Sequence, residues 1–223
     1  MNMDEKRSFI ECLEQGLRIS GEDISRILKL KNDPDPEIRV LLAQALVFQP
    51  ADIAESVLLE MIDDEELLVR INACDSLSIG ISENTVTALC RKARQDCYLV
   101  RGYALMSLAD VVQNRSDAPE SILPFLKKAY FTEKSGWVKG ACAYSLCLLG
   151  ESSYLVYLLK DLNHRIYQRR CAAVHLLTDL IEHNCMEDME LVKSAVIKRY
   201  QIESSIAVRS SIERFIKALE VHG

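Results

Sequence analysis

A phrase of apolar, basic and small residues recurs along the chain and sets its hydrophobic pattern. The six phrases begin at Ile38, Val69, Val100, Val138, Gln168 and Val208. In most of them an apolar residue is followed by a basic one and then by small residues, with another apolar residue eight positions after the start. The starts are 31, 31, 38, 30 and 40 residues apart. This period is typical of stacked helix pairs, so each phrase predicts the second helix of a pair.

The residues between the phrases predict the first helix of each pair. Apolar residues three and four positions apart follow a helix start signal in every repeat. The signals are Gly21 with Glu22 and Asp23, Pro50, Ser82 with Glu83, Asp117 with Pro119, Ser152 with Ser153, and Glu187 with Asp188. Pro124 falls inside the fourth of these helices and predicts a kink there.

Residues 4–18 predict one more helix, with Phe9, Ile10, Leu13 and Leu17 on its apolar face. Such a helix would cover the exposed core of the first repeat. The pattern therefore predicts an all-α chain that forms a single domain, 1–223. Its parts are a capping helix at 1–20 and repeats at approximately 21–49, 50–80, 81–115, 116–150, 151–184 and 185–223.

The phrases resemble HEAT repeats, especially the short bacterial kind, over about residues 20–220. The residues that carry the resemblance are the pairs Asp33 to Arg39, Asp64 to Arg70 and Asp96 to Arg101, then Ala43, Cys74 and Ala104, then Leu46, Leu77 and Leu108. Departures are Lys139, Gln168 and Glu213. The resemblance implies a right-handed α-α superhelix, that is, an α-solenoid of about six two-helix repeats.

In similar repeats, acidic and basic residues around the start of the second helix link neighbouring repeats. This implies a structural ladder, rather than a charged active site, for Asp35, Arg39, Asp64, Arg70, Asp96, Arg101, Lys139, Arg169 and Arg209.

The chain has a formal net charge of −6, which is unevenly distributed. Residues 1–70 hold 16 acidic residues against 8 basic ones, whereas residues 71–223 hold 17 against 19. Neither part has the concentrated basic stripe that a phosphate backbone requires, so nucleic acid is not the expected partner. Convergence of one basic cluster on a single exposed face would favour nucleic acid instead; its members are Arg165, Arg169, Arg170, Lys193, Lys198 and Arg199.

The sequence gives little evidence for disulfide, metal-binding or catalytic chemistry. The eight cysteines form no C-x-x-C pair, and several lie in Ala-rich helical segments, where a buried free thiol fits a reducing compartment. The four histidines show no metal-ligand spacing, and phosphate-loop, nucleophile-elbow and dinucleotide motifs are absent. We therefore expect no catalytic residues, metal or cofactor. With neither a secretory signal nor a membrane-length apolar run, the chain is predicted to be cytoplasmic.

Helical geometry predicts which side chains of the second helices point away from the core. They are Val40, Gln44 and Val47; Ile71, Asp75 and Ser78; Gly102, Met106 and Ala109; Gly140, Tyr144 and Cys147; Arg170, Val174 and Leu177; Ser210, Arg214 and Lys217. The hypothetical centre of partner binding is Gly102, Met106, Trp137, Gly140 and Tyr144. Tight packing between the protein's own helices is the competing, and favoured, interpretation of the two glycines.

The predicted solenoid is compatible with two functional classes. The first is a non-enzymatic protein-binding module, of scaffold, adaptor or inhibitor and immunity type, that holds a protein partner on the concave face formed by the second helices. It would be a monomer or a weak oligomer without membrane contact. The second class is an enzyme or nucleic-acid-binding protein, because some proteins with similar repeats are DNA glycosylases and others are bilin lyases.

Overall fold

The computed structural model describes residues 1–16, 19–115, 122–185 and 188–222. In these ranges the chain forms thirteen α-helices and no strand, so the predicted all-α solenoid fold is confirmed. None of the described helices combines the length and apolar character needed to cross a membrane. The chain divides into two compact units, Met1–Asp117 and Ala118–Gly223.

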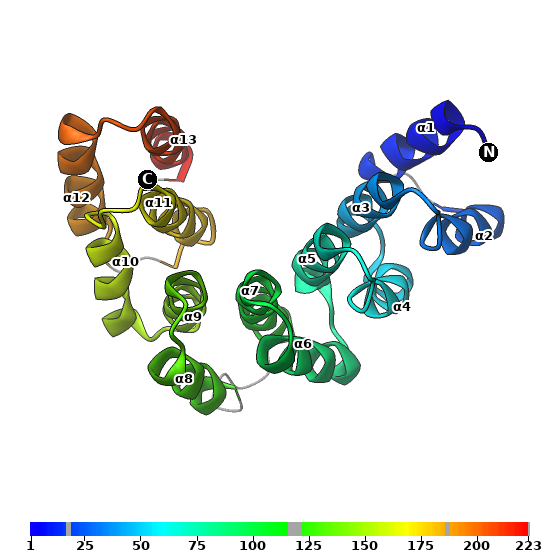
Figure 1. Cartoon of the computed structure of the whole chain (residues 1–223), viewed down its shortest axis with the longest axis horizontal. Helices are drawn as coiled ribbons and strands as arrows, with labels where there is room; N and C mark the ends of the chain where they lie inside the picture. The colour runs from blue at the N-terminus through cyan, green and yellow to red at the C-terminus, as the bar shows by residue number, and fades with distance from the viewer. Residues whose placement is uncertain (17–18, 116–121, 186–187, 223) are drawn as a thin grey trace. The chain divides into compact units, whose positions relative to one another are not determined.

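The first unit has two layers of helices, with α1, α3, α5 and α7 in one and α2, α4 and α6 in the other (Figure 1). Each helix of the first layer packs on the next, and each pair packs internally. The helices are α1 (Met3–Glu14), α2 (Gly21–Leu30), α3 (Pro36–Ala45), α4 (Ala51–Met61), α5 (Leu67–Ser76), α6 (Glu83–Gln95) and α7 (Tyr98–Asn114). Short 3-10 turns, η1 (Leu46–Phe48) and η2 (Leu77–Ile79), extend α3 and α5.

The second unit repeats this arrangement, with α9, α11 and α13 in one layer and α8, α10 and α12 packed against them (Figure 1). Its helices are α8 (Leu123–Thr132), α9 (Gly136–Leu148), α10 (Leu155–Asp161), α11 (Tyr167–Glu182), α12 (Met189–Ile202) and α13 (Ile206–His222), with the 3-10 turn η4 (Ser152–Tyr154) before α10. We call α3, α5, α7, α9, α11 and α13 the second helices. Each of the six predicted repeat ranges holds one helix pair.

Helix starts follow the chemistry of their first residues. Pro50 and Ser82 occupy the N-cap positions of α4 and α6, and the Ser82 hydroxyl accepts the backbone N–H of Thr85. Ser20, one residue before the predicted signal, forms a reciprocal capping box with Asp23. The predicted signals at Asp117, Pro119 and Glu187, and the predicted cap residue Leu17, lie outside the described residues.

The kink predicted at Pro124 is wrong. Helix α8 begins at Leu123, which places Pro124 in the first turn. A proline there costs no hydrogen bond, because the first N–H groups of a helix have no partner within the helix. Pro124 therefore helps to start α8 instead of bending it.

The capping helix α1 covers the start of the first unit. Ile10 and Leu13 are each only 2% exposed, and α1 packs against α3. The Gln49 side chain donates to the Leu13 carbonyl oxygen at 2.5 Å, so the end of the first repeat also holds the cap in place.

Ion pairs join consecutive repeats in the first unit. The Arg39 guanidinium binds both carboxylate oxygens of Asp64 at 2.8 and 2.9 Å, and Arg70 Nε lies 3.2 Å from Asp96. Each arginine also donates to a backbone carbonyl six residues earlier in its own repeat, that of Asp33 for Arg39 and that of Asp64 for Arg70. These bonds fix the turn between the two helices and connect it to the next repeat.

The two acidic residues before α3 do not pair with Arg39. Asp35 caps α3, because its carboxylate accepts a backbone N–H of the first turn at 2.9 Å. Asp33 forms an ion pair with Lys6 of α1 at 2.6 Å. The ladder therefore begins at the capping helix, with Lys6 in the position that an arginine holds in later steps.

The fifth phrase begins one residue later than its sequence suggests. Arg170, not Arg169, donates to the backbone carbonyl six residues earlier and binds the Glu203 carboxylate of the next repeat through two 2.7 Å bonds. Arg169 instead pairs with Asp161 of its own repeat at 2.7 Å. The buried and exposed positions of α11 match those of α3 only when Arg170 is aligned with Arg39.

The remaining ladder residues make local contacts. Arg101 donates to the Asp96 carbonyl oxygen at 3.2 Å. Lys139 Nζ lies 5.5 Å from the centre of the Tyr130 ring. Arg209 stacks 4.1 Å from the Tyr200 ring and donates to the Glu203 carbonyl oxygen at 3.3 Å.

A buried carboxylate joins the second repeat to the third. Glu55, on α4, is 7% exposed and accepts the backbone N–H groups of Ile81 and Ser82 and the Thr85 hydroxyl. Burial alone would raise the pKa of Glu55, but these hydrogen bonds outweigh it and lower that pKa. Glu55 therefore holds the start of α6 against α4 as an ionised group.

Candidate functional site

The five residues predicted as the centre of partner binding are divided between the two units. Gly102 and Met106 lie on α7 in the first unit, whereas Trp137, Gly140 and Tyr144 lie on α9 in the second. Met106 and Trp137 are partly exposed, so a role for them in binding stays a prediction.

Burial of α9 favours the packing interpretation of its glycine. A Cβ atom added at Gly140 would lie 3.3 Å from Cδ1 of Leu176 on α11, so the glycine permits close approach of the protein's own helix. Tyr144 is only 2% exposed, which leaves its side chain unavailable to a partner in this structure.

On α11 and α13, unlike on α9, the outward positions of the second helices are partly or fully exposed. After the one-residue correction of the fifth phrase, the outward positions of α11 are Cys171, His175 and Thr178, and those of α13 are Ser210, Arg214 and Lys217. Two of these positions on each helix line a common cleft. The sequence pattern therefore predicted the outward positions of α13 that line the cleft. It missed those of α11, because the fifth phrase begins one residue later than the sequence suggests.

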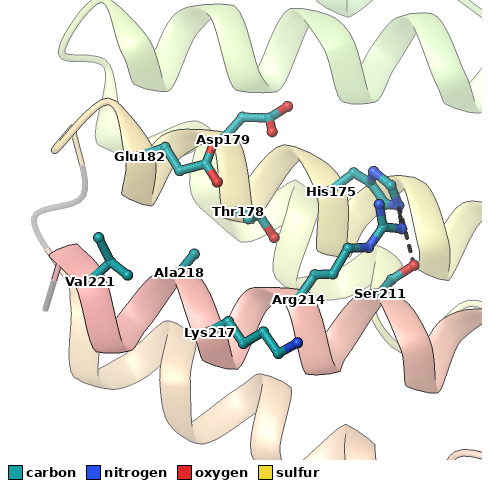
Figure 2. A pocket seen from close by; sticks show the side chains of 9 residues that line it. All are labelled: His175, Thr178, Asp179, Glu182, Ser211, Arg214, Lys217, Ala218 and Val221. Carbon is teal, nitrogen blue, oxygen red and sulfur yellow. Dashed lines mark hydrogen bonds between the residues drawn. The ribbon is translucent and has the colours of Figure 1, made fainter.

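This α11–α13 cleft has a volume of about 410 Å³, within the usual range for ligand pockets. Figure 2 shows Arg214 extending from α13 towards His175, while Glu182 lies nearer the other end. The lining residues are His175, Thr178, Asp179, Glu182, Ser211, Arg214, Lys217, Ala218 and Val221. We call His175, Ser211, Arg214 and Lys217 the basic end, and Asp179 and Glu182 the acidic end.

Hydrogen bonds at the basic end define the state of its histidine. Arg214 Nη2 lies 3.0 Å from Nε2 of His175, and the Ser211 hydroxyl lies 3.2 Å from the same nitrogen. Arginine can only donate, so Nε2 is the acceptor and the neutral ring carries its proton on Nδ1. Partial burial, and then the charge of Arg214, lower the pKa of His175 in agreement with this assignment.

The cations of the cleft are not ion-paired within the described part of the chain. Neither Arg214 nor Lys217 forms an ion pair with a carboxylate in the described ranges, and the Arg214 contact to His175 is with a neutral ring. Glu182 likewise has no ion-pair partner among those residues. Arg39, Arg70, Arg169 and Arg170 on the ladder are ion-paired, whereas these three side chains remain available to a ligand.

The basic cluster that would have favoured nucleic acid is divided by the ladder. Arg170 and Arg199 both bind Glu203, whose side chain is fully buried, and Arg169 binds Asp161. Three of the six cations are therefore neutralised inside the scaffold. This arrangement provides no continuous stripe for a phosphate backbone.

Three of the eight cysteines are buried, and the described residues form no metal-binding group. Burial raises the pKa of Cys74, Cys142 and Cys147 to about 12 in each case, which keeps them as unreactive thiols. No group of three or more His, Cys, Asp or Glu residues within the described ranges could hold a metal ion. The arrangement at the cleft is suited to binding charged groups.

The two-layered pairs and their ladder define the chain as an α-solenoid of helical repeats. Residues 24–109 match the family model described as HEAT repeats, so the resemblance inferred from the sequence is confirmed for this segment. The fold is similar to the X-ray structure of YibA from Escherichia coli, with a TM-score of 0.56 and 16% identity over 99% of this chain and 81% of that chain. An engineered protein aligns with a TM-score of 0.42 and 16% identity over 90% of this chain and 98% of that one. No curated protein matches the chain.

Proposed function

We propose that this protein is a non-enzymatic protein-binding solenoid that holds a partner on the layer formed by its second helices. HEAT repeats commonly mediate protein interactions, and stacked repeats provide an extended surface for this purpose. Scaffold, adaptor and inhibitor or immunity roles all use such a surface. The observation that carries the proposal is the α11–α13 cleft, whose cations form no ion pair in the described chain.

The ladder supports the same proposal, because it gives a structural role to charged residues that could otherwise suggest catalysis. Ion pairs such as Arg39 with Asp64 and Arg170 with Glu203 account for charged residues that could otherwise suggest catalysis. At the cleft, His175 Nε2 is occupied by Arg214 and the ring is held neutral, so the histidine is not arranged as a general base. The alternative of nucleic-acid binding is weakened because Glu203 and Asp161 neutralise three of the six cations in the basic cluster.

Site-specific photo-crosslinking in the source cell tests the proposal. A benzophenone side chain replaces an exposed residue of a second helix, Gln44 on α3 or Lys217 on α13. Matched controls carry it at exposed positions of the first helices, Lys29 on α2 and Lys193 on α12. We expect covalent protein adducts from Gln44 or Lys217 and none from the controls. Equal adducts from both layers, or adducts to nucleic acid alone, would contradict the proposal.

A further inference from the structure

Resting on the proposed function, we propose that the α11–α13 cleft binds an extended segment of the partner that carries an acidic side chain and, about three residues away, a basic one. The basic end would hold the acidic side chain and the acidic end the basic side chain. Neither the fold nor the family match assigns a ligand to this cleft.

The basic end is suited to a carboxylate. Arg214 and Lys217 supply two positive charges that form no ion pair among the described residues, and the Arg214 guanidinium can bind a carboxylate through two parallel hydrogen bonds. Because neither cation is ion-paired with a described carboxylate, an incoming carboxylate displaces no ion-pair partner.

The position of the acidic end determines how far the basic side chain of the bound segment lies from its acidic side chain. Glu182 follows His175 by two helical turns, which corresponds to a rise of about 10 Å along α11. Three residues of extended chain span about the same length. Between the two ends, Thr178 and Ala218 provide small side chains, and a cleft of about 410 Å³ has room for the backbone of such a segment.

The same geometry disfavours a polyanion. A second phosphate placed near the acidic end, about two helical turns along α11 from His175, would meet the Glu182 carboxylate. The charge pattern therefore selects a ligand with both signs over one with a single sign.

Peptide binding measured by NMR tests the inference. The probe is acetyl-Asp-Gly-Gly-Arg-amide, and the two controls replace its Asp with Asn or its Arg with citrulline. We expect saturable shifts of the His175, Thr178 and Ser211 signals with the first peptide and at least about tenfold weaker binding of each control. Binding should also raise the pKa of His175, because a carboxylate beside it offsets the charge of Arg214, which lowers that pKa in the free protein.

Protein variants provide the second arm of the test. The double variant Arg214→Gln/Lys217→Gln should lose the saturable shifts, whereas Lys193→Gln on α12 should retain them. Equal binding of the Asn peptide, unchanged affinity of the double variant, or equally tight binding of inorganic phosphate would overturn the inference. Photo-crosslinked protein at Gln44 without peptide binding would overturn the inference alone. Peptide binding without any protein adduct would overturn only the proposed function.

Discussion

Glu203 shows how a single residue connects two repeats. Its fully buried carboxylate accepts hydrogen bonds from Arg170 at 2.7 Å, Arg199 at 2.8 Å and the Ser205 backbone at 2.8 Å. The bond from Arg170, with smaller contributions from the other two, lowers the pKa of Glu203 to about 2. Removing one partner of such a pair leaves a buried charge without compensation.

The variant Glu203→Gln should therefore lower the free energy of unfolding by about 3 kcal/mol. The matched control is Glu22→Gln, which removes an exposed ion pair with Arg26 and should change that free energy by less than about 0.5 kcal/mol. Urea unfolding followed by circular dichroism measures both. Equal effects of the two substitutions would show that Glu203 does not join the repeats.

Glu203 also predicts how stability depends on pH. Its pKa falls from 4.5 to about 2 on folding, so the unfolded chain binds a proton at a higher pH than the folded chain does. The stability from this group is present above pH 4.5 and is lost as the pH falls towards about 2. Wild type should lose more stability than Glu203→Gln across this window in urea titrations at fixed ionic strength. Parallel curves would contradict the assignment.

At the scale of elements, the junction between α4 and α6 depends on a small residue. A Cβ atom added at Gly80 would lie 2.7 Å from Cγ2 of Thr85 and 3.0 Å from a carboxylate oxygen of Glu55. At Gly21, the first residue of α2, an added Cβ meets nothing within 4 Å. Gly80 therefore occupies a crowded position, whereas Gly21 occupies an open one.

Gly80→Ala should destabilise the protein by about 1–3 kcal/mol, because it displaces the side chains that hold the start of α6. Gly21→Ala should be neutral or slightly stabilising, since alanine favours the helix and no atom must move. Differential scanning calorimetry of both variants compares them directly. A Gly80→Ala protein as stable as wild type would mean that Glu55 can shift without cost.

The helices and their pairing were predictable from the sequence because each repeat shows the 3.6-residue period and a start signal. The register of α11 was not, because Arg169 and Arg170 follow each other and both fit the basic position. Glu203, 33 residues away, distinguishes them by its bond to Arg170, and that contact exists only after folding. The burial of Tyr144 could have been predicted from the residues around it. The segment from Gly140 to Leu148 has apolar or small residues on every face of the helix, which is typical of a fully buried helix.

At the scale of the whole molecule, exposure alone does not identify the binding surface. The first helices also expose apolar side chains, including Leu28, Val156, Leu191 and Ile197. Those residues are scattered singly over α2, α10 and α12, which is normal for a protein surface. On the second helices, α11 and α13 combine a cleft with charged side chains, Arg214, Lys217 and Glu182, that form no ion pair among the described residues.

Hydroxyl-radical footprinting of the chain, free and in complex with its captured partner, tests the central claim most directly. The second unit offers reporters on both layers: His175 and Val221 at the cleft, and Val156, Leu191 and Ile197 on the first helices. We predict that binding protects His175 and Val221 from oxidation and leaves the three first-helix residues unchanged. Protection of the first-helix residues with unchanged oxidation of His175 and Val221 would place the partner on the opposite layer and contradict the account.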